Sequence, residues 1–233
     1  PCQDIRVRKA ISHAINRQAL LAGARFGLGE LASCVFPGNQ WSHNPELKPV
    51  GFNPELSRSL LKEAGYSEGL TIRGHASNTT MNTTIASAIK NMLHNVGIEW
   101  KYDMLDAVAV SDRNANLEYD VAIAEWLYIY DPDMAANGMY YPDSGINFGR
   151  SNNKKAIELI AAGKNEFEFE KRKQIYQELE TVLYNNYEDA WLWWRQKARA
   201  FHKDVRGYDA KNYEKYMEAW KRSHYLSSLW FEN

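Results

Sequence analysis

The sequence is poor in the residues that build disulfide frameworks and metal sites. Only two of its 233 residues are cysteine, too few for a disulfide-rich scaffold or, by themselves, for a four-ligand zinc site. Cys2 and Cys34 could form one bridge or remain free, and we expect free thiols because unpaired cysteine commonly serves as a small apolar residue. The six histidines are scattered without metal-ligand spacing. We therefore expect no metal and no cofactor.

An excess of charge is also missing. The chain has 28 Lys and Arg residues against 29 Asp and Glu residues, a formal net charge of −1, so we expect no binding to nucleic acid or anionic lipid. No apolar run reaches the about 18 residues that a membrane-spanning helix needs. Residues 1–8 lack a basic stretch followed by an apolar segment, so we expect no signal peptide and either a cytoplasmic protein or a processed or truncated piece of a longer one.

Motifs of the common enzyme classes are absent as well. The sequence contains no G-x-S-x-G, H-E-x-x-H, P-loop, G-x-G-x-x-G or C-x-x-C motif. A lone histidine such as His75 is more often a local hydrogen-bonding residue than a base. We therefore expect no catalytic activity. The composition, 45% hydrophobic and 24% charged, is that of an ordinary globular protein.

The first part of the chain predicts helices with well-marked ends. Asp4 can cap an amphipathic helix, and Asn16 can cap a short second helix that ends at Gly23. After a loop, the run 53–55 (Asn-Pro-Glu) has the N-cap, first-turn proline and acid that begin a third helix, and Gly65 ends it.

The next part predicts a parallel sheet. Residues 69–75 and 98–104 are expected to be strands, with an amphipathic helix between them, which together form a right-handed βαβ unit. Asp106 can cap a further helix, and residues 119–126 are expected to be a third strand. Residues 153–187 have helical periodicity. The predicted fold class is therefore α/β, with a mostly parallel sheet covered by helices.

Ligands of such sheets bind beyond the carboxyl ends of the strands. Two segments are expected there. Residues 76–80 supply hydroxyl and amide groups, and residues 126–133 combine aromatic rings with two carboxylates, which suits a peptide or an oligosaccharide. The candidate ligand-binding residues are Ser77, Asn78, Trp126, Tyr128, Tyr130, Asp131 and Asp133. The structural alternatives are that Ser77 and Asn78 cap a helix, that Trp126 and Tyr130 pack beneath the loop, and that Asp131 caps a turn.

Two motifs resemble those of a known family. Residues 4–17, DIRVRKAISHAINR, are similar to the signature D-x-R-V-R-x-A-x-x-x-A-I-D-R of the family 5 extracellular solute-binding proteins, the oligopeptide- and dipeptide-binding proteins of ABC transporters. Residues 52–66, FNPELSRSLLKEAGY, resemble the family's F-D-P-E-K-A-K-x-L-L-x-E-A-G-Y. The resemblance covers essentially the whole chain, and both motifs belong to the C-terminal half of family members.

The resemblance implies a lobe of the periplasmic-binding-protein type II fold. Residues 1–187 would form the C-terminal, ligand-binding lobe of a two-lobed clamp, and residues 188–233 would return to a missing N-terminal lobe. Such proteins bind a small-molecule or peptide solute without changing it and deliver it to ABC transporter permease subunits. The implied location is periplasmic or otherwise extracytoplasmic, and the implied partners include no nucleic acid.

One position departs from the family pattern. Peptide binders typically place an aspartate three residues after the tryptophan that corresponds to Trp126, where this chain has Ile129. Either Asp131 or Asp133 takes over the pairing with a peptide amino group, or the ligand lacks a free amine. Two further interpretations stay open within the fold: an oligosaccharide-binding member of the family, and the ligand-sensing domain of a cytoplasmic transcriptional regulator. A glycoside hydrolase that uses Asp131 and Glu125 has less support.

Overall fold

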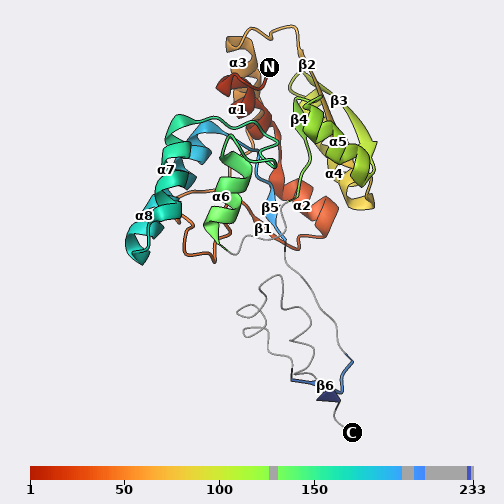
Figure 1. Cartoon of the computed structure of the whole chain (residues 1–233). Coiled ribbons are helices and arrows are strands. Elements are labelled where there is room, and N and C mark those ends of the chain that lie inside the picture. Colours follow the sequence, from red (N-terminus) through yellow and green to blue (C-terminus); the bar gives the residue numbers. More distant parts are fainter. Residues whose placement is uncertain (126–130, 196–201, 208–229, 232–233) are drawn as a thin grey trace.

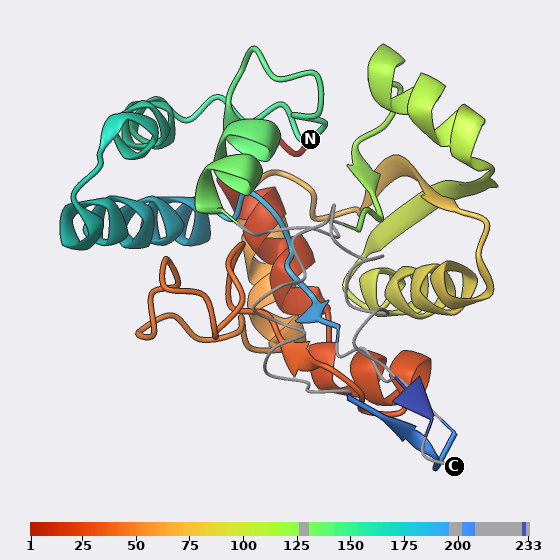
Figure 2. The same cartoon turned by 60° about the horizontal axis from the view of Figure 1, so that its bottom comes forward.

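The computed structural model describes residues 1–125, 131–195, 202–207 and 230–231 (Figure 1). In the described residues a small parallel sheet with its helices lies on one side, and a group of helices lies on the other. Helix α1 and the strand that follows α8 run between these two parts (Figure 2). No described helix has the length and apolar character needed to cross a membrane.

The three predicted N-terminal helices form, as α1 (Ile5–Ala14), α2 (Arg17–Arg25) and α3 (Pro54–Glu63). The prediction that Gly23 ends α2 is wrong. The helix continues to Arg25 and ends where Phe26 adopts the left-handed conformation, with φ 55°. A glycine inside a helix costs only about 1 kcal/mol relative to alanine, which the packing of one buried face of α2 readily offsets.

The predicted βαβ unit is confirmed, with strand β2 (Leu70–Ser77), helix α4 (Thr80–His94) and strand β3 (Ile98–Leu105). The strands pair in parallel from Leu70 opposite Ile98 to Ser77 opposite Leu105. Helix α5 (Ala107–Asn116) begins at the predicted cap, Asp106, whose carboxylate accepts hydrogen bonds from two backbone N–H groups.

Strand β4 (Val121–Ala122) completes the parallel sheet in the order β3-β2-β4. It is much shorter than the predicted strand 119–126, although Asp120 N and Ile123 N still donate to backbone oxygens of β2. The two paired positions are Gly74 opposite Val121 and His75 opposite Ala122, and the buried indole of Trp100 lies close to Gly74.

The group of helices on the other side contains α6 (Pro132–Tyr140), α7 (Lys154–Asn165) and α8 (Phe169–Asn186). The helical periodicity of 153–187 is confirmed, with a break at residues 166–168 that separates α7 from α8. Helix α6 was not predicted, because its first turn lies in a segment expected to be a ligand-binding loop.

Two short antiparallel pairs involve late parts of the chain. Strand β1 (Glu30–Leu31) pairs with β5 (Trp193–Trp194), and β6 (Val205–Arg206) pairs with β7 (Trp230–Phe231). The segment after α8 therefore returns to the region that follows α2.

Buried residues form two hydrophobic cores. One core joins α1, α2, α3 and α4 to the sheet, and the other joins α6, α7 and α8 to the segment that contains Cys34 and Phe36. Both cysteines are free thiols, as expected.

Arg17 links the two parts. Its guanidinium is buried and donates to Trp191 O at 2.6 Å, Ser12 O at 2.8 Å and Val50 O at 3.2 Å. Burial lowers the pKa of Arg17 to about 10. The residue therefore holds three chain segments together through their carbonyl groups.

Candidate functional site

The carboxyl end of β2 leads directly into α4 and forms the first half of the candidate site. We call residues 77–81 the strand-end segment. Asn78 N donates to Leu105 O at 2.8 Å, and Thr79 N donates to Ser77 O at 2.8 Å, so the backbone is fixed by its neighbours. Thr79 is the N-cap of α4, and its hydroxyl accepts a hydrogen bond from Asn82 N at 3.2 Å.

Because Thr79 caps the helix, the side chains of Ser77 and Asn78 are not needed for capping. Neither side chain has a hydrogen-bond partner among the residues that the structure describes, and Asn78 is exposed. A hydroxyl and an amide that are held on a rigid turn and have no partner can donate to and accept from a bound molecule.

Trp126, Tyr128 and Tyr130, the predicted aromatic residues of the second segment, lie outside the described residues. Asp131 is described, and it is the N-cap of α6: its Oδ1 accepts from Asp133 N at 2.9 Å. The capping alternative stated above thus describes this side chain correctly.

Asp131 also forms a bidentate ion pair with Arg172 of α8. Arg172 donates from Nη2 to Oδ1 at 2.8 Å and from Nη1 to Oδ2 at 3.0 Å. Burial raises the pKa of Asp131, but hydrogen bonds from Arg172 and from the Asp133 amide outweigh it, so the pKa lies below its ordinary value. The Asp131 carboxylate is therefore ionised at neutral pH and already has a cationic partner.

Arg172 is placed by aromatic rings. Its guanidinium carbon lies 5.4 Å from the ring centre of Trp41 and 5.2 Å from that of Tyr176, and its Nε donates to Gly163 O at 3.1 Å. The Tyr176 hydroxyl in turn donates to Asp133 at 3.4 Å. No pattern in the sequence connects Asp131 to a residue 41 positions later, so this cluster was not predicted.

The structure thus brings Asp131 and Asp133 together at the start of α6 and places Ser77 and Asn78 at the end of β2. No described contact joins the two pairs. Sequence reasoning also missed an apolar group beside the strand-end segment, formed by Phe26, Leu28 and Met81, which we call the apolar rim.

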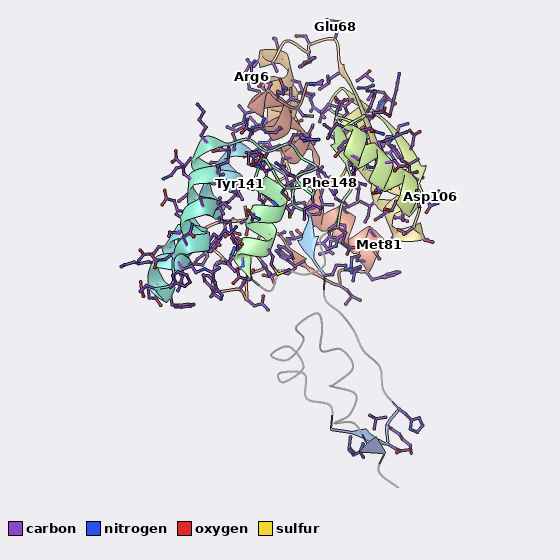
Figure 3. All side chains as sticks on the ribbon, in the orientation of Figure 1. Arg6, Glu68, Met81, Asp106, Tyr141 and Phe148 are labelled. Atoms are coloured by element: carbon purple, nitrogen blue, oxygen red, sulfur yellow. The ribbon has the colours of Figure 1, made fainter. Side chains whose placement is uncertain are left out.

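The apolar rim is exposed: the accessible fractions are 90% for Phe26, 53% for Leu28 and 37% for Met81. Arg25 joins its parts, because the guanidinium donates to Leu28 O at 3.0 Å and lies 3.6 Å from the Met81 sulfur. Met81 stands in the first turn of α4, close to α2 (Figure 3). Through Met81, the rim adjoins the segment that carries Ser77 and Asn78.

The described residues offer little for catalysis. They hold no group of three or more side chains that could bind a metal ion. His75 is buried and bonded through Nε2 to Asn114 at 3.0 Å, and burial lowers its pKa. Glu125 and Asp131 are both ion-paired, with Arg195 at 2.6 Å and Arg172 at 2.8 Å.

A pocket of about 970 Å³ lies elsewhere, on the face of the sheet beside α5. Its charged side chains are largely satisfied by one another: Arg113 pairs with Asp103 at 2.5 Å, and Lys90 pairs with Glu99 at 3.6 Å. These pairs leave the strand-end segment as the better candidate for a binding site.

Comparisons with known proteins agree on one family. Residues 1–148 match the model of "Bacterial extracellular solute-binding proteins, family 5 Middle". The "Di/tripeptide-binding protein 1" of Pseudomonas aeruginosa is 27% identical over 194 residues, which cover 78% of this chain and 36% of that protein. The chain thus spans about a third of the length of the curated relatives it matches.

Solved structures share the fold. The periplasmic binding protein DppA from Helicobacter pylori, in complex with peptide STSA, has a TM-score of 0.83 and 23% identity, and the match covers 89% of this chain and 41% of that one. The binding protein AgaA from A. tumefaciens R10, in complex with agropinic acid, has a TM-score of 0.79 and 24% identity over 89% of this chain and 44% of that one. The predicted α/β fold of the periplasmic-binding-protein type II kind is confirmed.

Proposed function

The chain belongs to family 5 of the bacterial extracellular solute-binding proteins, and on that premise we propose that it is a ligand-binding part of the substrate-binding component of an ABC transporter that imports peptides. It binds its solute at the strand-end segment and releases it unchanged. The relatives named for di- and tripeptides support a peptide as the solute.

The observation that carries the proposal is the contrast at the carboxyl end of β2. Ser77 and Asn78 have unpaired polar side chains on a fixed turn, and the apolar rim lies beside them. A peptide offers both matching features: backbone amide and carbonyl groups at regular intervals, and apolar side chains between them.

The remainder of the site is proposed from the sequence. Trp126, Tyr128 and Tyr130 would supply rings to the same edge. Because Asp131 already pairs with Arg172, Asp133 is the better candidate of the two for a peptide amino group. Its hydrogen bond from the uncharged Tyr176 hydroxyl is long, at 3.4 Å, so the Asp133 carboxylate can still accept hydrogen bonds from a cationic group.

The clamp arrangement is part of the proposal. Residues 1–187 would form one lobe, and residues 188–233 would return toward an N-terminal lobe of the same protein. The first part of this last segment still belongs to the described body, because β5 pairs with β1. The partners are then that lobe, the solute and the permease subunits, and the location is periplasmic or otherwise extracytoplasmic. With a net charge of −1, nucleic acid is not among the partners.

Titration calorimetry on the full-length protein tests the proposal. We expect a mixture of di- and tripeptides to bind and to be recovered intact. The double variant Ser77→Ala/Asn78→Ala should weaken binding by about 5- to 150-fold, since each lost hydrogen bond contributes about 0.5–1.5 kcal/mol.

Thr71→Ala is the matched control, because this exposed hydroxyl stands at the opposite end of β2, and it should leave the affinity unchanged. A full-length protein that binds oligosaccharide but no peptide would contradict the peptide assignment. Equal affinities for wild type and the double variant would remove the strand-end segment from the site.

A further inference from the structure

Strand β3 forms one edge of the parallel sheet. In the order β3-β2-β4 it pairs only with β2 among the described strands, and it lies on the outer side of the sheet (Figure 1). At one end of the pair Leu70 N donates to Gly97 O at 2.9 Å. At the other end Asn78 N donates to Leu105 O at 2.8 Å. The odd-numbered residues of β3 therefore turn their backbone groups toward β2, and the even-numbered residues turn theirs outward.

The outward backbone groups have no partner in the part of the chain that the structure describes. They belong to Ile98, Trp100, Tyr102 and Met104, and they form no hydrogen bond outside the strand pair. The described strands β1, β4, β5, β6 and β7 are each two residues long and already paired. An open edge of eight residues is a template for a further strand. We call residues 98–105, with their outward groups, the β3 edge.

Charges of alternating sign line the face of β3 that lies toward α5. They belong to Glu99, Lys101 and Asp103. Asp103 accepts from Arg113 through Oδ2 at 2.5 Å, which leaves Oδ1 available on a side chain that is 61% exposed. Lys101 is exposed and has no partner among the described residues. The β3 edge therefore carries both an unpaired cation and an accessible carboxylate.

The neighbouring charges leave this complementarity intact. Glu99 already lies near Lys90, at 3.6 Å, and near His94, at 3.5 Å. Arg73 of β2 pairs with Asp120 at 3.9 Å. The other acids of this face belong to α5 and the residues beside it: Asp106, which caps the helix, and the exposed Asp112 and Glu118. Lys101 is thus the cation on this face that lacks a partner in the described residues, and carboxylates surround it.

Two copies of β3 that run antiparallel can pair their outward backbone groups in several registers. A register that sets Lys101 opposite its counterpart also sets Glu99 opposite Asp103, so like charges oppose each other throughout. A shift of two residues sets Lys101 of each copy opposite Asp103 of the other. The opposite shift would use Glu99, whose two oxygens already have cationic neighbours. Charge therefore selects the register that joins Lys101 to Asp103.

Apolar side chains on the other face of β3 fit the same register. Trp100 is fully buried, and its ring centre lies 4.5 Å from that of Tyr102. Tyr102 and Met104 are only half-buried. In the selected register Tyr102 lies opposite its counterpart, and Met104 lies opposite Trp100 of the second copy. Cross-strand aromatic pairs of this kind stabilise antiparallel strands.

We propose that the β3 edge is a dimerisation surface, at which two copies of this protein pair their β3 strands antiparallel about a two-fold axis at Tyr102. The two three-stranded sheets then continue as one. A second copy is the occupant because the same strand supplies both Lys101 and Asp103, so the surface is its own complement. The strand-end segment lies at the end of β2 and outside this edge, so dimerisation and solute binding can be tested separately.

Sedimentation velocity of the full-length protein over a concentration series tests the proposal, and we expect a reversible monomer–dimer equilibrium. Lys101→Asp would set carboxylates opposite each other, and Asp103→Lys would set ammonium groups opposite each other. Each variant alone should raise the dimer dissociation constant by about tenfold or more. An equimolar mixture of the two restores opposite charges at both positions and should form heterodimers. Lys62→Asp, an equal change of charge at an exposed position of α3, is the control and should leave the dissociation constant unchanged.

A cysteine crosslink tests the position of the axis. Facing residues of a hydrogen-bonded antiparallel pair have Cα atoms about 5.5 Å apart, which suits a disulfide. Mild oxidation should therefore link two copies of Tyr102→Cys. Thr71→Cys, at an exposed position of β2 away from the edge, should remain unlinked, as should the wild type.

Several results would overturn the proposal. A wild type that stays monomeric at every concentration would do so, and protection of the β3 amides from hydrogen exchange in that monomer would show that another part of the chain covers the edge. Single charge variants that dimerise as tightly as wild type, or a mixture of them that stays monomeric, would overturn the pairing of Lys101 with Asp103. A dimer that binds no peptide would count against the proposed function and leave the dimerisation surface standing.

Discussion

Gly163 lies where α7 crosses the buried ring of Tyr176, and its replacement by alanine tests how the Arg172 cluster is held. A Cβ atom at Gly163 would lie 2.8, 3.0 and 3.1 Å from three atoms at the hydroxyl end of that ring. Ordinary van der Waals contact begins near 3.4 Å, so the ring or the helix must shift by about 0.6 Å. Tyr176 has no exposed surface and packs edge-on against Phe36, which leaves it little room.

Two effects of opposite sign decide the outcome. Alanine is favoured over glycine inside a helix by about 1 kcal/mol, whereas overpacking a buried site typically costs about 1–3 kcal/mol. We expect overpacking to dominate at Gly163 and to destabilise the protein by about 1–2 kcal/mol. The matched control is Gly23→Ala in α2, where an added Cβ meets nothing within 4 Å. At Gly23 only the higher helix propensity of alanine acts, and the substitution should stabilise the protein by about 0.5–1 kcal/mol.

Urea unfolding of both variants, followed by circular dichroism, measures this difference. Since Gly163 O also accepts from Arg172, the shift should loosen the Arg172–Asp131 pair and raise the pKa of Asp131. If Gly163→Ala stabilised the protein as much as Gly23→Ala, the close packing of α7 on Tyr176 would be refuted.

Two further predictions concern buried ionisable groups. Glu180 is buried and its two carboxylate oxygens accept from two backbone N–H groups, at 3.0 and 2.6 Å. Glu180→Gln would place an amide N–H group opposite one of these backbone N–H donors, and we expect the free energy of urea unfolding to fall by about 1–3 kcal/mol. Glu178→Gln, at an exposed, ion-paired position, is the control and should lower it by at most about 1 kcal/mol. Equal losses for the two variants would contradict this prediction. Burial lowers the pKa of His75 below 6.5, so the unfolded chain takes up more protons near that pH and stability should fall as the pH drops from 7.5 to 5.5. The fall should be smaller in His75→Gln, and an identical pH dependence in both proteins would show that His75 is not responsible.

Local signals explain why much of the fold could be predicted. Asn53 and Asp106 cap α3 and α5 as expected, because an N-cap hydrogen bond depends only on the next two or three residues. The βαβ unit was also predictable, since two apolar strands and an intervening amphipathic helix leave few ways to bury their apolar faces.

The misses come from contacts between distant residues. Gly23 did not end α2, because tertiary packing extends the helix past a weak local stop. The pairing of Asp131 with Arg172 was not predicted, because it depends on how α6 packs against α8. The exposure of the apolar rim likewise depends on the whole lobe, although the isolated Phe26 and Leu28 outside any helical stripe were a signal that could have been used.

Ser77 and Asn78 were placed at the end of β2 from the sequence, but only the structure shows which of the neighbouring polar residues caps α4. The cap is Thr79, so the two preceding side chains stay unpaired. Periodicity could not distinguish these three neighbouring polar residues, because each of them can serve as an N-cap.

Hydrogen–deuterium exchange tests most directly whether the strand-end segment binds the solute. It is measured on the full-length protein with and without a saturating mixture of di- and tripeptides. We predict that peptides covering residues 77–81 and the apolar rim at residues 26–28 gain protection, while the sheet face beside α5 is unchanged. Protection at that sheet face, with residues 77–81 exchanging at the same rate in both states, would contradict a binding site at the end of β2.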